Sequence, residues 1–114
     1  METMEFLGRY HLRQSDRYFK LGRDSVLLSR FATVKPRWQV CDLGCGIGSL
    51  LLLLSQREEE LVRVGVELDP GAAALARENL DRNGLSGEIL TGDLRDRSLL
   101  AGDRSRKSPV RISP

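Results

Sequence analysis

The sequence contains few of the residues that usually hold metals or form disulfides. Among its 114 residues are two cysteines and one histidine. Cys41 and Cys45 have neither a second cysteine pair nor a nearby histidine, so the usual zinc and disulfide patterns are excluded. We therefore expect no metal and two reduced thiols, as in a cytoplasmic protein. His11 lies in a polar N-terminal stretch that we expect to be irregular, and it is predicted to be a surface residue without a chemical role.

The sequence also has no strong net charge and no apolar run of membrane-spanning length, and its first residues are not expected to be a signal peptide. Its net charge of +2 is too small to indicate nucleic-acid binding by itself. Met1 to Glu5 has none of the basic and apolar regions of a signal peptide, and the run of leucines from Leu50 to Leu54 fits a core helix. Hydrophobic residues make up 40% and charged residues 30%, which is typical of one small soluble domain.

What the sequence does contain is a strand, a glycine loop and a helix in direct succession. Gln39 to Leu43 is too short for a helix and suits a parallel strand that is covered on both faces. Gly44, Gly46 and Gly48 then allow positive φ angles and leave no Cβ in the way of a ligand. The following helix directs its unpaired N–H groups and its positive dipole end to the same place.

The spacing of these glycines distinguishes the loop from two other nucleotide-binding patterns. The dinucleotide fingerprint Gly-x-Gly-x-x-Gly needs a glycine where Ser49 stands, which disfavours NAD, and the phosphate-loop ending Gly-Lys-Ser/Thr is absent. Asp42 followed by glycines at alternate positions resembles motif I of the Rossmann-like methyltransferases that bind S-adenosylmethionine. For the loop alone, a strand–turn–helix whose glycines serve only the turn stays open as an alternative.

Two further acidic residues follow predicted strands. Glu67 ends the strand Arg63 to Glu67, and Asp93 follows the strand Glu88 to Thr91. In a doubly wound sheet, ligands bind beyond the carboxyl ends of the strands. A carboxylate about 20 residues after the glycine loop is placed to accept hydrogen bonds from two ribose hydroxyls. The sequence therefore predicts Asp42, Glu67 and Asp93 along one edge of a parallel sheet.

Helical patterns lie before and between these strands. The helix before the first strand is predicted to begin with Asp24 as its cap. Its apolar residues recur at helical spacing and are expected to pack in the core; they are Leu27, Leu28, Phe31 and Ala32. Asp69 and Pro70 are predicted to start the helix after the second strand, and Gly84 to end it. This alternation of strands and helices predicts right-handed crossovers.

Residues 18–96 resemble the bacterial tRNA adenine-N6 methyltransferases that modify valine tRNA beside its anticodon. The matching pieces are Phe19 to Leu28, Asp42 to Gly48, Gly65 to Asp69, Ala76 to Asn79, Asn83 to Leu85, and Gly92 to Leu94. The glycine loop and Glu67 are common to many S-adenosylmethionine enzymes. Gly22 to Leu28 is more particular to this family and its near relatives, which methylate ribosomal RNA guanine or the side-chain amide of release-factor glutamine.

The resemblance implies an α/β fold: the N-terminal half of a Rossmann-like, class I methyltransferase domain, with a mostly parallel sheet in a three-layer αβα arrangement. It implies S-adenosylmethionine as cofactor and RNA, specifically tRNA, as substrate. The three glycines would face the methionine part, Glu67 the ribose, and Asp93 with Leu94 the adenine. Asp42 would brace the loop, and Lys20 to Asp24 would border the amino-acid end of the cofactor. The cofactor-binding residues predicted in this way are Asp42, Gly44, Cys45, Gly46, Gly48, Glu67, Leu68, Asp93, Leu94, Lys20 and Asp24.

The sequence also departs from the family. The motif Asn-Pro-Pro-Tyr, which grips the target amine in these enzymes, is absent, so no catalytic residue is predicted. We divide the chain into an extension (1–17), the cofactor-binding half-domain (18–96) and a basic, serine-rich tail (97–114) that is predicted to be disordered. The tail could contact RNA phosphates, but we favour a truncated or frame-shifted end.

A domain that stops after three strands would leave Val40 to Leu43 as an open, apolar sheet edge that invites pairing with another chain. We therefore expect the chain alone to be poorly stable, to bind cofactor weakly and not to catalyse. Two other functions stay open: the release-factor glutamine or ribosomal RNA type of methyltransferase, and a non-catalytic nucleotide-binding or interaction module.

Overall fold

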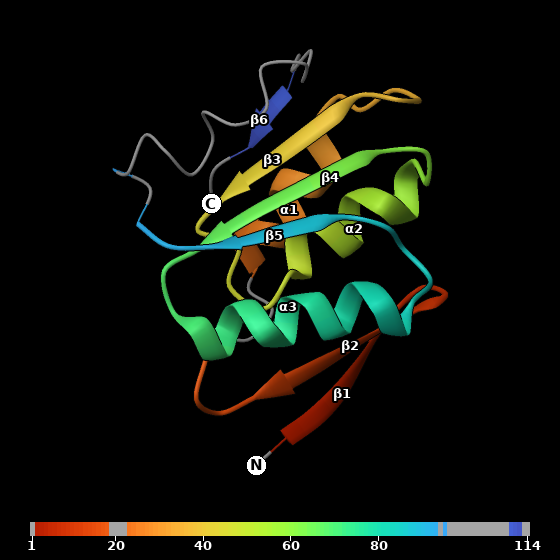
Figure 1. The fold of residues 1–114 in the computed structure, drawn as a ribbon. Coiled ribbons are helices and arrows are strands. Elements are labelled where there is room, and N and C mark those ends of the chain that lie inside the picture. Colours follow the sequence, from red (N-terminus) through yellow and green to blue (C-terminus); the bar gives the residue numbers. More distant parts are fainter. Residues whose placement is uncertain (1, 19–22, 94, 96–109, 113–114) are drawn as a thin grey trace.

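The computed structural model describes residues 2–18, 23–93, 95 and 110–112 (Figure 1). Two sheets are present in this part of the chain. One is an antiparallel hairpin of β1 and β2, and the other has four strands in the order β5-β4-β3-β6. The elements in chain order are β1 (Glu2–Leu7), β2 (Tyr10–Ser15), α1 (Arg23–Phe31), β3 (Gln39–Leu43), α2 (Ser49–Arg57), β4 (Val62–Glu67), α3 (Pro70–Arg82), β5 (Glu88–Thr91) and β6 (Val110–Ile112).

The predicted strands of the main sheet are confirmed. β3 pairs with β4 in parallel, with Asp42 opposite Gly65, and β4 pairs with β5 in parallel, with Gly65 opposite Ile89. Val40, Val64, Val66 and Ile89 are buried, as the short apolar runs of these strands indicate, whereas Val62 at the start of β4 is 50% exposed. Because the three strands are parallel, the segments that follow them all leave from the same edge of the sheet.

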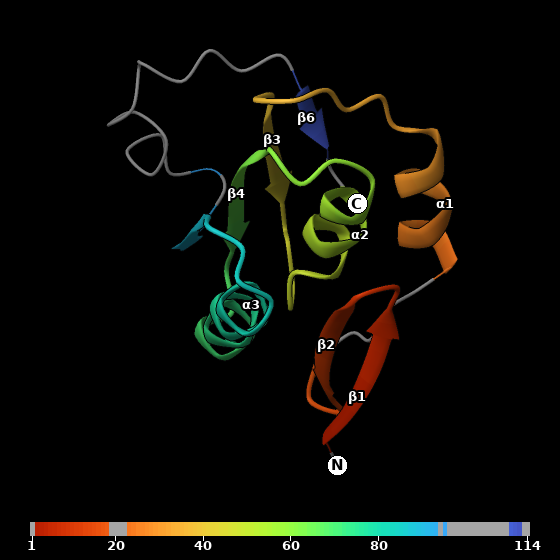
Figure 2. The same cartoon turned by 90° about the vertical axis from the view of Figure 1, so that its right-hand side faces the viewer.

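The helices of the described chain all lie on one side of the sheet (Figure 2). α2 contacts β3, α3 contacts β4 and β5, and α1 lies against α2. This follows from topology, because two successive right-handed crossovers in the same direction place their helices on the same face. The Rossmann-like parallel sheet is therefore confirmed, while a second helical layer, as in the predicted αβα arrangement, is not seen among the described residues.

The prediction that β3 forms an open sheet edge is wrong. β6 pairs with it in parallel, with Val40 opposite Val110 and Asp42 opposite Ile112. The prediction treated residues 97–114 as disordered, and Val110–Ile112 forms a strand instead. Three residues are enough to form this short strand, because the unpaired backbone N–H and C=O groups at the edge of β3 are available to pair with it. The rest of that segment lies outside the described residues.

The N-terminal stretch is a β-hairpin, which corrects the expected irregular structure. The turn between its strands contains Gly8, whose φ is 61°. Leu7, Tyr10 and Leu12 are buried, and the Tyr10 hydroxyl donates to the Ser55 carbonyl oxygen over 3.2 Å. The hairpin therefore packs its inner face on α2 and α3 and belongs to the folded unit.

Helix α1 differs from its prediction in two ways. It begins at Arg23, so Asp24 lies in its first turn instead of capping it. Leu27 and Phe31, which were expected in the core, are 44% and 83% exposed. Among the described elements the main contact of α1 is with α2, and these two side chains lie outside that contact. At its C-terminal end, the Arg57 guanidinium donates to the carbonyl oxygens of Ser29 and Ala32.

Helix α3 begins and ends as its sequence predicts. The Asp69 side chain accepts from the Gly71 N–H over 2.8 Å, Pro70 is the first helical residue, and Gly84 has φ of 67° just beyond the end. Within residues 2–18, 23–93 and the short C-terminal pieces, none of the helices combines the length and apolarity that crossing a membrane requires.

Candidate functional site

The glycine loop between β3 and α2 is tied to the end of β4. The N–H groups of Gly44 and Cys45 both donate to the Val66 carbonyl oxygen, over 2.7 and 2.9 Å. Gly44, Gly46 and Gly48 have φ angles of 80°, 56° and 91°, a region that side chains with a Cβ rarely adopt. The predicted positive φ angles are thus present at all three glycines.

The three glycines nevertheless differ in what lies beside them. A Cβ on Gly48 would lie 3.5 Å from the Cα and Cβ of Ala76, which is an ordinary contact, so α3 packs directly beside this glycine. A Cβ on Gly44 or on Gly46 would meet nothing within 4 Å. Their φ angles require glycine, and the space beside them leaves room for a ligand against the backbone.

Glu67 holds the loop from the end of β4. One carboxylate oxygen accepts from the Gly46 N–H over 2.8 Å, and the other accepts from the Asp69 N–H over 2.9 Å. A carboxylate has about four acceptor positions, so further donors can still bind. Glu67 is therefore both a brace of the loop and an available acceptor at the edge of the sheet.

Asp42 is buried at the end of β3, directly before the loop. Its side chain is 1% exposed, and its Oδ1 atom has no hydrogen-bond partner in the described chain. Burial, with the nearby Glu67 charge as a second cause, raises the pKa of Asp42 to about 7. A buried carboxylate oxygen without a partner is unfavourable, and such groups concentrate at functional sites.

The Cys45 side chain lies between the glycine loop and Gly65 of β4. Its side chain is 4% exposed, and burial, with the charges of Asp42 and Glu67 as further causes, raises the pKa of its thiol to about 12. The thiol is therefore protonated near neutral pH and is a packing group, not a nucleophile. The absence of a side chain on Gly65 makes room for it, since a Cβ there would lie 2.7 Å from the Cys45 Sγ.

We expect Gly65→Ala to lower the free energy of unfolding by about 1–3 kcal/mol, because the added methyl would lie 2.7 Å from the Cys45 Sγ and 2.9 Å from the Ile89 Cδ1. Urea unfolding at pH 7 measures the change. In a Cys45→Ala background the same substitution should cost less, because the contact with the sulfur atom is gone and only that with Ile89 remains. Equal costs in both backgrounds would show that Cys45 is not what Gly65 accommodates.

A cavity of about 430 Å³ opens beside the loop and Glu67. It is lined by Asp16, Arg17, Tyr18, Gly46, Glu67, Asp69 and Ala72. The end of the hairpin supplies one wall and the first turn of α3 another. A Cβ on Gly71 would lie 1.9 Å from the Tyr18 hydroxyl, which shows how closely the two walls meet. Only Gly46 and Glu67 of this lining were predicted as site residues, since no sequence pattern shows that the hairpin reaches the loop.

The other predicted residues are less closely tied to the cavity. Leu68 follows Glu67 and is 67% exposed. Asp93 forms an ion pair with Arg95 over 2.6 Å, and this contact lowers the pKa of the Asp93 carboxyl. Lys20 and Leu94 lie outside the described residues, and for Asp24 only the backbone position in α1 is described.

Comparison with known proteins places this geometry in a family. The model of the methyltransferase small domain family matches residues 21–101. A tRNA1(Val) (adenine(37)-N6)-methyltransferase from Haemophilus influenzae is 42% identical over 76 residues, which cover 66% of this chain and 33% of the relative. The relative of the same name from Cronobacter sakazakii is 48% identical over 63 residues, covering 54% and 26%. The chain spans about a third of the length of the curated relatives it matches.

Solved structures support the fold. M. jannaschii TYW2 in complex with AdoMet superposes with a TM-score of 0.70 at 20% identity, covering 83% of this chain and 45% of that one. The Pyrococcus abyssi tRNA (uracil-54, C5)-methyltransferase in complex with S-adenosyl-L-homocysteine has a TM-score of 0.65 at 18% identity, covering 81% and 24%. The parallel sheet, the glycine loop and the family match agree, and the chain belongs to the methyltransferase small domain family.

Proposed function

We propose that this chain binds S-adenosylmethionine, as the cofactor-binding part of an N-methyltransferase that acts on tRNA adenine. The observation that carries the proposal is the pairing of the Gly46 N–H with the Glu67 carboxylate at the open face of the loop. It places a backbone surface without side chains directly beside an acceptor for ribose hydroxyls.

The residues present fit such a cofactor. Gly44 and Gly46 leave open a cradle that any Cβ would fill. Asp42 has a buried oxygen without a partner in the described chain, as expected of a site built for a positively charged group. Leu68 exposes a large apolar side chain next to Glu67, where it can cover the face of a base.

The charges of the cavity favour this cofactor over a dinucleotide. Asp16, Glu67 and Asp69 contribute three carboxylates to the lining, against the single cation Arg17. A pyrophosphate would be repelled by such a surface, whereas a sulfonium and an ammonium group would be attracted. This physical argument agrees with Ser49 standing where the dinucleotide fingerprint requires glycine.

When bound, the cofactor supplies a methyl group that its positive sulfur atom already makes electrophilic. The reaction then needs little acid–base catalysis, and the contribution of the protein is to orient the cofactor and the target amine. We assign the hydroxyls of the ribose to Glu67, and the backbone contact to Gly44 and Gly46. Cys45 and Gly48 support the loop from below, and Asp93 with Leu94 is proposed to border the adenine. Lys20 to Asp24 is proposed to border the amino-acid end.

The substrate proposal comes from the relatives. The matched proteins from H. influenzae and C. sakazakii are named as methyltransferases of adenine 37 in tRNA1(Val). Because the chain spans about a third of their length, methyl transfer is proposed for this lineage as a whole, and cofactor binding for the 18–96 segment of this chain.

The binding step can be tested by calorimetric titration with S-adenosylhomocysteine, with NADH as a control ligand. We expect saturable binding of the first compound alone, and a loss of affinity of at least tenfold in Glu67→Ala. The matched control is Glu60→Ala, which removes an exposed carboxylate from the loop after α2 and should change the affinity less than twofold.

Binding of NADH instead would overturn the cofactor assignment. Unchanged affinity in Glu67→Ala would show that the ribose lies elsewhere. A folded chain that binds neither compound would favour the non-catalytic interaction module, and circular dichroism distinguishes this result from a failure to fold.

A further inference from the structure

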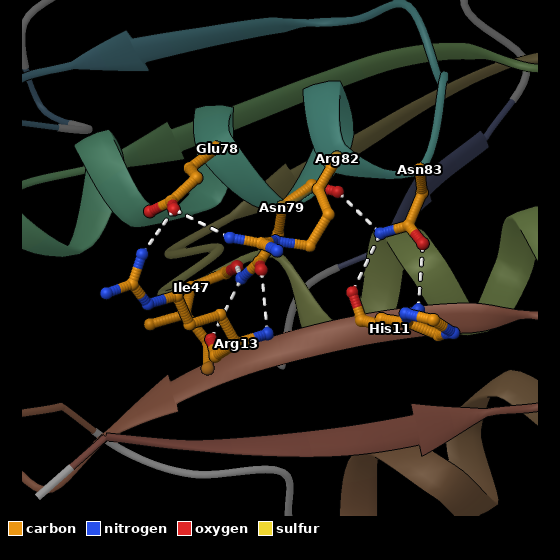
Figure 3. Close-up of polar contacts among 7 residues, drawn as sticks. All are labelled: His11, Arg13, Ile47, Glu78, Asn79, Arg82 and Asn83. Atoms are coloured by element: carbon orange, nitrogen blue, oxygen red, sulfur yellow. Dashed lines mark hydrogen bonds and ion pairs between the residues drawn. The ribbon is translucent and has the colours of Figure 1, made fainter.

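Helix α3 and its C-cap residue present two asparagines, Asn79 and Asn83, to the outer edge of strand β2 (Figure 3). Asn83 accepts from the His11 N–H over 2.7 Å and donates to the His11 carbonyl oxygen over 2.8 Å. Asn79 does the same for Arg13, over 2.8 and 3.1 Å. Each side-chain amide therefore pairs with a strand residue as a neighbouring strand would, and the two hold the hairpin against α3.

Asn79 makes one contact that Asn83 lacks. Its amide also donates to the carbonyl oxygen of Ile47, over 2.8 Å, and Ile47 lies in the glycine loop between Gly46 and Gly48. The third contact of Asn83 stays within α3, on the Asn79 carbonyl oxygen. Asn79 is fully buried, with 0% exposure, so these bonds are shielded from competing water.

This places Asn79 between the two walls of the cavity. Arg13 is three residues before Asp16, where the hairpin begins to line the cavity, and Ile47 directly follows Gly46, which lines it from the loop. We propose that Asn79 is a positioning residue of the cofactor site: one side-chain amide joins the hairpin wall to the glycine loop and sets the distance between them. This inference rests on the proposed function.

No other side chain of this size supplies the same contacts. Asn79 uses one acceptor and two donors at once. Aspartate would keep the acceptor and place a negative charge against two carbonyl oxygens, and alanine would remove the side-chain partner of the Arg13 N–H, the Arg13 carbonyl and the Ile47 carbonyl. The chain contains its own matched control, because Asn83 makes the same pair of strand contacts without the loop contact.

The first test compares Asn79→Ala with Asn83→Ala, using the affinity for S-adenosylhomocysteine measured at a temperature where both variants are folded. We expect Asn79→Ala to lose at least tenfold in affinity and Asn83→Ala to lose less than twofold. Ser55→Ala, in the buried second half of α2, controls for stability alone: it should lower the unfolding midpoint and leave the affinity within twofold. Glu78→Gln, which removes the ion pair to Arg13, should also be neutral for binding.

A second pair of variants approaches the same contact from the hairpin, in case Asn79→Ala does not fold. Arg13→Pro removes the N–H that Asn79 accepts from, and His11→Pro removes the one that Asn83 accepts from. Both N–H groups point away from β1, so proline spares the ladder between the strands. We expect at least a tenfold loss of affinity in Arg13→Pro and less than twofold in His11→Pro.

The outcomes separate this inference from the function it rests on. If the wild-type chain binds no S-adenosylhomocysteine, the proposed function fails and the inference fails with it. If the wild-type chain binds and both pairs lose affinity equally, or neither does, the cofactor site stands and the special role of Asn79 is refuted. Loss confined to Asn79→Ala and Arg13→Pro supports it.

Discussion

Replacing Asp42 by asparagine should raise the free energy of unfolding at pH 8 by up to about 4 kcal/mol, less the cost of burying the new amide N–H2 group. The reason is that the folded chain must hold an ionised carboxylate in a site that is 1% exposed. A rise of its pKa from the ordinary 3.8 to about 7 corresponds to a cost of that size once the group is ionised in both states. Asparagine has nearly the same shape and carries no charge.

The sign of the pH dependence follows from the same shift. Between about pH 4 and 7, Asp42 is protonated in the folded chain and ionised in the unfolded chain, so unfolding releases a proton. The contribution of Asp42 to stability therefore falls as pH rises through this range and stays low above pH 7. The stability of Asp42→Asn relative to wild type should therefore be lowest at pH 4 and highest at pH 8.

Urea unfolding of both chains from pH 4 to 8 measures this difference, which cancels the contributions of other carboxyl groups. Glu67→Gln provides the control, because the Glu67 charge is the second cause of the raised pKa, and its removal should reduce the slope in wild type but not in Asp42→Asn. A difference that does not grow with pH would show that the pKa of Asp42 is not raised in the folded chain.

A side chain that lowers the stability of the fold this much often contributes to function. If Asp42 attracts the positive groups of the cofactor, Asp42→Asn should bind S-adenosylhomocysteine less tightly than wild type while unfolding at a higher urea concentration. The two changes in opposite directions would distinguish a ligand-site carboxylate from an ordinary defect of packing.

The parts of the site that the sequence predicts correctly are those set by neighbouring residues. The positive φ angles at Gly44, Gly46 and Gly48 follow from the glycines themselves, and the position of Glu67 follows from the length of its strand. The start of α3 follows from the side chain of Asp69, which caps the helix two residues away. Each of these rests on interactions within a few positions or on the regular geometry of parallel strands.

The parts it misses depend on contacts between distant segments. Asn79 and Arg13 are 66 positions apart, and nothing in the polar sequence of β2 indicates that its backbone will pair with a helix side chain. The cavity wall formed by Tyr18 depends on that docking. Likewise, the pairing of β6 with β3 and the exposure of Phe31 depend on which surfaces happen to be free, which periodicity does not show.

Replacing Gly46 by alanine should reduce the affinity for S-adenosylhomocysteine at least 100-fold, about 2.7 kcal/mol of binding free energy, while the chain remains folded. Gly46 lines the cavity, and its missing Cβ leaves a face with nothing within 4 Å. A methyl group there would occupy the surface on which we place the cofactor. Its N–H also holds Glu67, so a shift of the loop would move the ribose acceptor as well.

Gly84→Ala is the matched control for this substitution. Gly84 has φ of 67° against 56° for Gly46, and a Cβ on it would also meet nothing within 4 Å, but it ends α3 away from the cavity. Both alanines should cost about 1–2 kcal/mol of stability, because both force a side chain into the left-handed region. Calorimetric titration should then show the large loss of affinity in Gly46→Ala alone.

If the two variants bind equally well, the open face of Gly46 is a feature of the turn, and the cofactor must lie elsewhere. If they lose stability equally and differ only in binding, the glycine loop is a ligand surface, because strain of the backbone alone would affect both variants in the same way.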